Sequence, residues 1–239
     1  MSNASVGQDA YVHSCVNSSV GATLHAATQS GCTFGSLTSS GLPILSAPLP
    51  ITQAQIDQWK QDALAGGVIS GNYDLSGTQS ATLGPKKIQG SLTVQNFAQL
   101  TLAGTLWVTG NIEVKNSAQV RLDASYGTLS GVIVSDGEIT LQNSSVSSGS
   151  GQAGSYLMYL SVSSLPGAIE IKNNAILDIV YTSQGGIEIK NNLQLKEATG
   201  YSIHLKNNAT ITYESGFQDA RFTSGPGASF ELSSWKEIE

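Results

Sequence analysis

The chain has 239 residues, of which only 12% are charged, and its 26 glycines accompany abundant serine, threonine and asparagine. This balance is typical of turn-rich β proteins with solvated surfaces rather than of helical cytosolic enzymes. The net charge of -6 and the presence of only two arginines exclude the basic surface that nucleic-acid binding requires.

The first 50 residues form a segment rich in serine, glycine and alanine that ends in "GLPILSAPLP", which predicts an extended connector rather than a core element. Cys15 and Cys32 are the only cysteines of the chain, and an even count favours a disulfide between them. Closing a loop of this size stabilises such a segment by roughly 3 kcal/mol in the chain-entropy model. Two alternatives stay open. One is a zinc site completed by His13 and His25, without the usual Cys-x-x-Cys spacing, and the other is two free thiols.

Residues 51–66 read "ITQAQIDQWKQDALAG" and predict the one helix of the chain. Thr52 and Gln55 form a capping box, apolar residues including Trp59 recur at helical spacing, and glycines end the pattern. We expect a helix over 53–65 that caps one end of the fold that follows it, where bare strand edges otherwise invite aggregation.

Residues 67–239 are dominated by a repeat of the form Gly-x-apolar-x-apolar-Gln/Lys-Asn. Its six copies are "GSLTVQN", "GNIEVKN", "GEITLQN", "GAIEIKN", "GGIEIKN" and, with one extra residue, "GYSIHLKN". The asparagines that close them lie 20, 27, 30, 18 and 16 residues apart and are Asn96, Asn116, Asn143, Asn173, Asn191 and Asn207. Periods of about this length are typical of solenoids. The repeat therefore predicts an all-β fold, a right-handed single-stranded parallel β-helix of six or seven coils.

Each copy alternates in the manner of a half-buried strand. Ile169 and Ile171 are expected to point inward, Glu170 and Lys172 outward, and the chain to turn at Asn173. A second alternating strand and a third apolar stretch follow in most copies. Stacked coils would bring the asparagines into one column whose amides hydrogen-bond along the axis, whereas a β-sandwich needs no asparagine at this point. Residues 67–89 are expected to form an irregular first coil and residues 225–239 a second cap.

Several phrases carry a family resemblance, among them "LGPKKIQGSLTV", "GTLWVTGNIEVKN", "SGVIVSDGEI", "GSGQAGSYLM", "KNNATITYESG" and "FTSGPG". Together, over about residues 45–239, they resemble uncharacterised β-helix surface proteins of ultrasmall, candidate-phylum bacteria. Members of that family often carry a pilin-like N-terminal membrane helix, which this chain lacks. The resemblance implies an extracellular or cell-surface location and brings no catalytic residues.

Four side chains are the ligand-binding candidates. Trp107 lies between two expected inward residues, so its indole is predicted to point outward, where it could stack on a sugar, anchor a partner or be covered by a loop. Tyr156 lies in the longest insertion. Arg121 and Asp178, with Lys196, fall in the second-strand column, where they form either a lyase-like cluster or a structural ion ladder. The outward Glu and Lys columns are interpreted as a solvated face whose opposite charges offset one another.

The sequence as a whole predicts a non-catalytic extracellular module, structural or adhesive, of a bacterial cell envelope or pilus-like appendage, with no cofactor and no metal. Its expected partners are a surface polysaccharide or another envelope protein. Membrane insertion is not expected, because no run of 18 apolar residues occurs. The alternative is a carbohydrate-active enzyme, a polysaccharide lyase or hydrolase, or a glycan-binding module on the same fold. Hydrolysis needs two carboxylates about 5 to 10 Å apart, and the sequence offers no close Asp pair.

Overall fold

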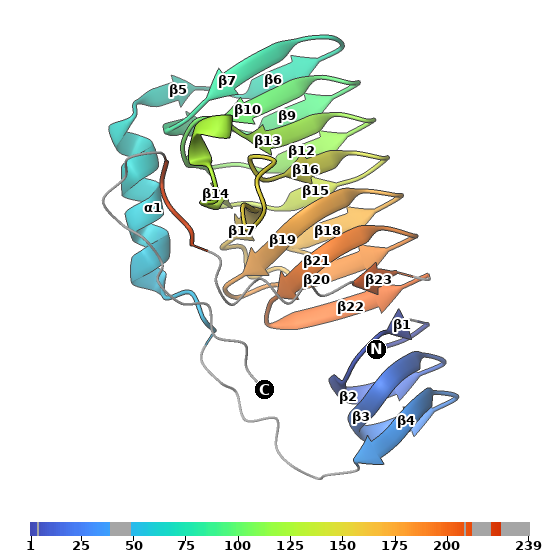
Figure 1. Cartoon of the computed structure of the whole chain (residues 1–239). Helices are drawn as coiled ribbons and strands as arrows, with labels where there is room; N and C mark the ends of the chain where they lie inside the picture. The colour runs from blue at the N-terminus through green and yellow to red at the C-terminus, as the bar shows by residue number, and fades with distance from the viewer. Residues whose placement is uncertain (4, 39–48, 208, 212–220, 226–239) are drawn as a thin grey trace.

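The computed structural model of the chain describes residues 1–239 except 4, 39–48, 208, 212–220 and 226–239. Over these residues the fold is all-β, with two sheets whose strands pair in parallel and one α-helix alongside them (Figure 1). The repeats seen in the sequence lie next to one another in chain order, each paired with the one before and the one after it.

The first strands of successive repeats make the seven-stranded sheet, in the order β22-β20-β18-β15-β12-β9-β6. Their bounds are Tyr73–Ser76 for β6, Leu92–Gln95 for β9, Ile112–Lys115 for β12, Ile139–Leu141 for β15, Ile169–Lys172 for β18, Gly186–Lys190 for β20 and Ser202–Lys206 for β22. This sheet carries the asparagine repeat.

The second and third strands of each repeat belong to the 16-stranded sheet. The second strands are β7 (Ser80–Leu83), β10 (Gln99–Leu102), β13 (Gln119–Leu122), β16 (Val146–Ser148) and β23 (Thr210–Ile211). The third strands are β5 (Val68–Ser70), β8 (Lys86–Gln89), β11 (Leu106–Val108), β14 (Gly131–Ser135) and β17 (Leu157–Ser161). Two longer strands, β19 (Ile176–Thr182) and β21 (Gln194–Thr199), pair in both positions. A short 3-10 helix, η1 (Ala124–Tyr126), follows β13.

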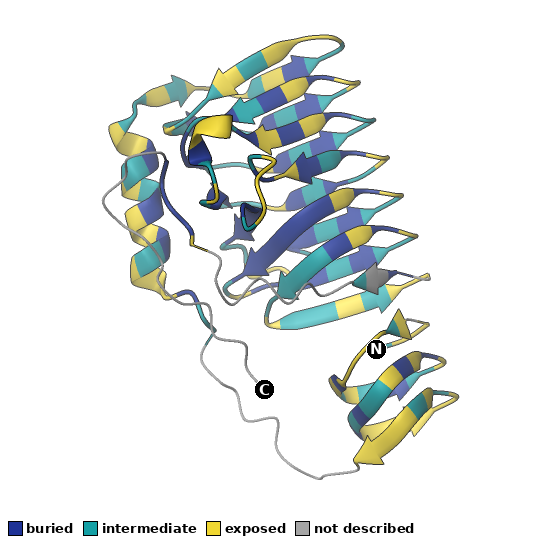
Figure 2. Ribbon diagram, viewed as in Figure 1, coloured by how far each residue is buried: buried dark blue, intermediate teal, exposed yellow. Residues whose placement is uncertain are grey.

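The register between repeats pairs like with like. Between β18 and β20, Ile169 lies opposite Ile187, and Glu170 opposite Glu188. The isoleucines are fully buried and the glutamates half-buried, which confirms the predicted alternation (Figure 2). The inward residues of all three strand positions form one continuous aliphatic core along the stack.

Each of the first strands from β9 onward ends in an asparagine with a left-handed backbone. The φ angles are 57° at Asn96, 56° at Asn116, 54° at Asn143, 56° at Asn173, 60° at Asn191 and 55° at Asn207. In five of these turns the next residue also has a positive φ, for example 61° at Asn174. Asparagine tolerates this region better than other side-chain-bearing residues, so the repeat has a backbone reason for its choice.

The helix α1 (Gln53–Ala65) begins after the N-cap Thr52, as the sequence predicts. Its position is different from the one expected: it contacts β8, β11 and β14 and lies along the side of the stack instead of over its end (Figure 1). The reason is that β14 and β17 are buried on both faces. Their outward apolar residues, such as Val134 and Met158, need a cover, and Trp59 with its helical neighbours supplies it.

A segment from the far end of the chain completes this cover. The backbone of Ser130 bonds to Arg221 and Thr223, and the ring of Phe222 meets Trp59 edge-on at 6.4 Å between centroids. Residues 221–225 therefore lie against both α1 and the third strands (Figure 1). The second cap predicted at 225–239 falls outside the described residues except for Gly225.

The N-terminal segment differs from the predicted extended connector. It contains β1 (Ser5–Val6), β2 (Ala10–Val16), β3 (Ser19–Ser30) and β4 (Thr33–Thr38), which pair in parallel. Through β1, which pairs with β3 on one side and β23 on the other, this N-terminal unit joins the C-terminal end of the large sheet. Its small core is formed by residues including Val20 and Leu24.

Replacing Ile171 by Asp tests the inward register. The change puts a charge without a partner into the aliphatic core, and we expect it to lower the free energy of unfolding by at least about 4 kcal/mol. The matched control Glu170→Gln, one residue away on the outward side, should cost less than about 1 kcal/mol. Urea denaturation followed by circular dichroism measures both values. Equal losses in the two variants would show that the inward and outward positions are assigned wrongly.

Candidate functional site

The asparagines at the first-strand ends form an uninterrupted hydrogen-bonded column. Each side-chain Nδ2 donates to the Oδ1 of the asparagine in the preceding repeat, over 2.9 to 3.0 Å, from Asn207 to Asn96. Asn96 in turn donates to Ser76 Oγ at 3.1 Å. A primary amide has two N–H donors and two lone pairs, so each of these side chains still has one donor and one acceptor to offer.

An open groove of about 570 Å³ follows this corner of the stack. It is lined by Asn116, Asn143, Ser144, Asn173, Asn174, Asn191 and Asn192. The lining consists of amides and a hydroxyl, which can both donate and accept hydrogen bonds, and it contains no charged side chain. Such a surface is chemically suited to neutral, hydroxyl-bearing ligands. We call it the asparagine groove.

Phe97 occupies the same corner one repeat before the groove. Its side chain is 68% exposed and its backbone φ is 70°, a region that bulky residues rarely adopt. The equivalent positions in later repeats hold serine or asparagine. The sequence analysis did not single it out, although its place directly after the repeat asparagine was the available signal.

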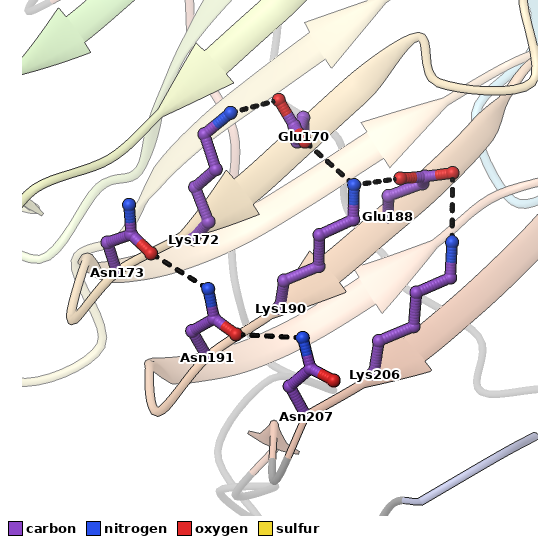
Figure 3. Close-up of polar contacts among 8 residues, drawn as sticks. All are labelled: Glu170, Lys172, Asn173, Glu188, Lys190, Asn191, Lys206 and Asn207. Atoms are coloured by element: carbon purple, nitrogen blue, oxygen red, sulfur yellow. Dashed lines mark hydrogen bonds and ion pairs between the residues drawn. The ribbon is translucent and has the colours of Figure 1, made fainter.

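The outward glutamates and lysines pair across strands (Figure 3). Lys172 and Lys190 lie 2.6 and 2.8 Å from the Glu170 carboxylate. Lys190 also pairs with Glu188, which is reached by Lys206 at 3.4 Å. Each carboxylate thus lies between two ammonium groups, which offsets the repulsion between like charges stacked in neighbouring strands.

These contacts change the pKa values of the groups. Burial is the largest single influence on Glu170 and raises its pKa, but hydrogen bonds from Lys172 and Lys190 together outweigh it, so the net pKa is lowered. The hydrogen bond from Lys190 lowers the pKa of Glu188. Hydrogen bonds to Glu170 and Glu188 raise the pKa of Lys190. The network therefore favours the charged form of all three groups.

A second, smaller charged group lies earlier in the stack. Lys115 is 2.6 Å from the Glu113 carboxylate, which also accepts a hydrogen bond from Gln142 at 3.0 Å. Thr140 separates it from the larger network, since it lies between Glu113 and Glu170 in the register. The outward face is thus two local networks, and each is paired within itself.

Trp107 is half-buried beside the helix. Its Nε1 donates to Asp136 at 2.9 Å, and the Lys87 ammonium lies 3.8 Å from the ring centroid. Lys60 of α1 binds Asp136 at 2.6 Å and lies 5.5 Å from the same ring. The indole does point outward from its strand, as expected, but α1 and its lysine lie over it. These partners belong to distant parts of the sequence, so the repeat pattern gave no signal for them.

Asp178 is buried, with 5% exposure, and its carboxylate holds backbone groups in place. It accepts the N–H of Gly149 at 2.9 Å and of Leu157 at 3.0 Å, and lies 3.1 Å from the Lys196 ammonium. Arg121 is exposed and is not brought to Asp178. It lies opposite Ser148, on a strand that stands between the two. This places their backbones roughly 9 to 10 Å apart.

Tyr156, the last of the ligand-binding candidates, is 6% exposed and packs in the apolar cluster beneath the helix. The Lys196 ammonium lies 5.0 Å from its ring. Its side chain therefore contributes to packing at the end of the insertion that Asp178 anchors.

The two cysteines are joined. Cys15 and Cys32 form a disulfide with a Cα–Cα distance of 6.4 Å, and Cys15 is fully buried. Of the histidines considered with them, His25 stacks flat on Tyr11 at 4.0 Å between ring centroids. Within the described residues no group of three or more His, Cys, Asp or Glu side chains is arranged to hold a metal ion.

Replacing Asp178 by Asn tests its anchoring role. The neutral amide loses charge-assisted bonds to Gly149 and Leu157, and we expect the unfolding free energy to fall by about 2 to 4 kcal/mol. Amide hydrogen exchange at those two residues should become faster. The control Lys196→Met removes the ion pair but keeps both amide bonds, so their protection should remain. Unchanged exchange in Asp178→Asn would contradict the assignment.

The glutamate network predicts a pH dependence. Because the folded-state pKa values of Glu170 and Glu188 are lowered, their contribution is present above the unfolded pKa of about 4.3 and is lost as the pH falls through the lower folded values. The double change Glu170→Gln and Glu188→Gln should therefore reduce the loss of stability between about pH 6 and pH 2, by roughly 1 kcal/mol or less because the groups are partly exposed. The exposed Glu138→Gln is the control. An identical acid profile for the double variant and the wild type would count against the network.

Comparison with known proteins adds no relative to this picture: no protein-family model, curated protein or solved structure matches the chain. None of the described helices is both long and apolar enough to cross a membrane. The functional argument therefore comes from the chemistry of the residues themselves.

Proposed function

We propose that the chain is a non-catalytic structural or adhesive module of a bacterial cell envelope or pilus-like appendage, displayed outside the cell. The envelope setting follows from the resemblance to surface proteins of candidate-phylum bacteria. The structural role follows from how the outward side chains are used. A surface polysaccharide is the partner that the exposed chemistry suits best.

In this proposal the fold is a single-stranded parallel β-helix. One chain passes through three strand positions and then begins the next repeat in register, which supports this description over two independent sheets. A right-handed winding is favoured, because parallel crossover connections are right-handed in about 98% of cases. At about 4.8 Å for each step, the seven first strands span roughly 30 Å.

One observation carries the structural part of the proposal: the repeated outward side chains bind their equivalents in the next repeat. The asparagine amides bond along one column and the glutamates and lysines along two others (Figure 3). Side chains held in this way stiffen the stack, since each ladder must break when neighbouring repeats separate. Such a module can hold a ligand-binding surface at a fixed distance from its anchor.

The asparagine groove supports the adhesive part. Its amides keep donors and acceptors free after the column is formed, and they repeat at the spacing of the strands, about 4.8 Å. Hydroxyl groups of an extended polysaccharide can pair with such an array without any charge on the ligand. Phe97, exposed at the end of the same corner, offers an apolar ring face to a sugar.

The enzymatic alternative rests on Arg121 and Asp178. Asp178 is engaged by two backbone amides and Lys196, while Arg121 donates to Thr101 at 3.5 Å on the exposed face. These contacts support structural roles for both residues. The alternative is tested directly below by an assay for turnover.

A glycan array and assays for reducing ends and unsaturated products test the proposal. We expect binding to a neutral or weakly charged polysaccharide without turnover. The double change Asn174→Gly and Asn192→Gly removes two groove amides while glycine retains the left-handed backbone, and it should weaken binding by about tenfold or more, the cost of one to two hydrogen bonds.

The matched control is Ser117→Gly, the same kind of change at an equivalent turn position that does not line the groove. It should bind as the wild type does. Turnover abolished by Arg121→Ala or by Asp178→Ala, in variants that remain folded, would replace the proposal with the enzymatic alternative. Binding unaffected by the groove variant would remove the groove as the site.

A further inference from the structure

The strand stack has two ends at which the described residues show no further strand. At one end the sheets stop at β5, β6 and β7. At the other, β4 of the N-terminal unit pairs only with β3. All these strands run parallel, so the two ends are opposite edges of one strand direction.

The peptide groups at the first end point away from the molecule. Gln99 N–H bonds to the carbonyl of Gln79, and Ala103 N–H to that of Leu83. Because peptide groups alternate along a parallel strand, the N–H and C=O of Ser80 and Thr82 in β7 face the open edge. By the same reasoning, the bond from Lys87 N–H to the Gly67 carbonyl leaves Ser70 of β5 facing that edge.

The same alternation applies to the other end. Thr33 N–H bonds to the carbonyl of Ser18 in the adjacent turn of the N-terminal unit, so the N–H and C=O of Phe34 face outward from β4. The side chains of Phe34 and Leu37 remain partly exposed there, and Leu37 is 42% accessible. At the first end, Ile69, Tyr73 and Leu83 are likewise only partly buried at the limit of the main core.

The chemistry of the two edges lacks the usual protection. Exposed sheet edges are ordinarily blunted by lysine, inward charges or proline. No charged residue and no proline occurs in Thr33–Thr38 of β4, in Ser80–Leu83 of β7 or in Val68–Ser70 of β5. Only β6 is partly protected, by Asp74 and by the Gln79 side chain, which accepts the N–H of Ser76 at 2.9 Å.

The junction between β23 and β1 shows that this sheet accepts a strand that does not follow in sequence. Ser5 and Val6 pair in register with Thr210 and Ile211, and β1 then pairs with β3. The second-strand column thus runs from β7 through β23 to β1, β3 and β4 in one direction. Its last member has the same polarity as its first.

We propose that the open edge of β4 in one copy pairs with the open edge of β7, and with it β5, in a second copy of this chain. The contact joins two different surfaces, so it leaves one free edge of each kind at the ends of the assembly. Repetition gives a head-to-tail filament rather than a closed dimer. This proposal depends neither on glycan binding nor on the envelope location.

The wild-type chain tests the proposal first. Sedimentation velocity and light scattering should show assemblies whose mean mass rises with protein concentration. Hydrogen exchange at the amides of Thr82 and Phe34 should become slower over the same concentration range. A monomer at every concentration, or discrete dimers that leave both amides unprotected, would overturn the proposal.

Two edge variants make the test specific. Thr82→Pro and Ser70→Pro each remove an N–H that faces the open edge without removing a bond inside the molecule. Each should stay monomeric at concentrations where the wild type assembles, and Thr82→Pro, which still has its β4 edge, should shorten wild-type assemblies when added to them. Circular dichroism melting establishes that the variants are folded.

The matched control Thr82→Val keeps the N–H and the strand-forming character of the side chain, so it should assemble as the wild type does. Assembly of both folded proline variants at wild-type concentrations would overturn the proposed edges. If either variant fails to fold, the other one and the exchange measurement on the wild type still decide the question.

Discussion

The register between repeats is the constraint on which the rest of the structure depends, and the asparagine at the end of each first strand sets it. A shift of one residue would move Glu170 to the position of Ile171 and place charges in the aliphatic core. Asparagine fixes the register twice, because its backbone adopts the left-handed turn and its amide bonds to the same residue in the next repeat. Insertions can then differ in length between fixed points. The repeats that end at Asn143 and Asn173 are the longest and still align with their neighbours.

A second constraint follows from the third strands, which are buried on both faces. Strands such as Gly131–Ser135 give the core one side and expose an equally apolar side outward, so they need a cover from another part of the chain. The helix at Gln53–Ala65 and residues 221–225 provide it together, and they meet through Trp59 and Phe222. This arrangement ties the two halves of the sequence to the middle of the stack. It also accounts for Trp107, whose ring and N–H are occupied by groups that α1 brings or supports.

Local patterns in the sequence predicted the helix, the alternation and the asparagine turns, because each depends on residues that are close in the chain. The position of the helix was predicted wrongly, since it depends on which strands are apolar on both faces. The continuous runs "GVIVS" and "YLMYLS" carried that information. The N-terminal strands also had a signal: "SVG", "SVG" and "TFG" begin at residues 5, 19 and 33, a shorter period than that of the main repeat. The Lys60 to Asp136 contact had none, because it joins residues far apart in the sequence that no repeat relates.

A fold built by pairing equivalent residues satisfies most of its polar groups internally, and the groups it leaves over indicate where it can act. Along the side, they are the second donor and acceptor of each amide in the asparagine groove. At the ends, they are the outward peptide groups of β4, β5 and β7. These two sets are geometrically related, since the groove runs along the axis in which the ends would join. Stacking of copies would repeat the groove at a constant interval and in one orientation. A long polymer could then contact several grooves at once, and weak binding at each would combine into strong attachment.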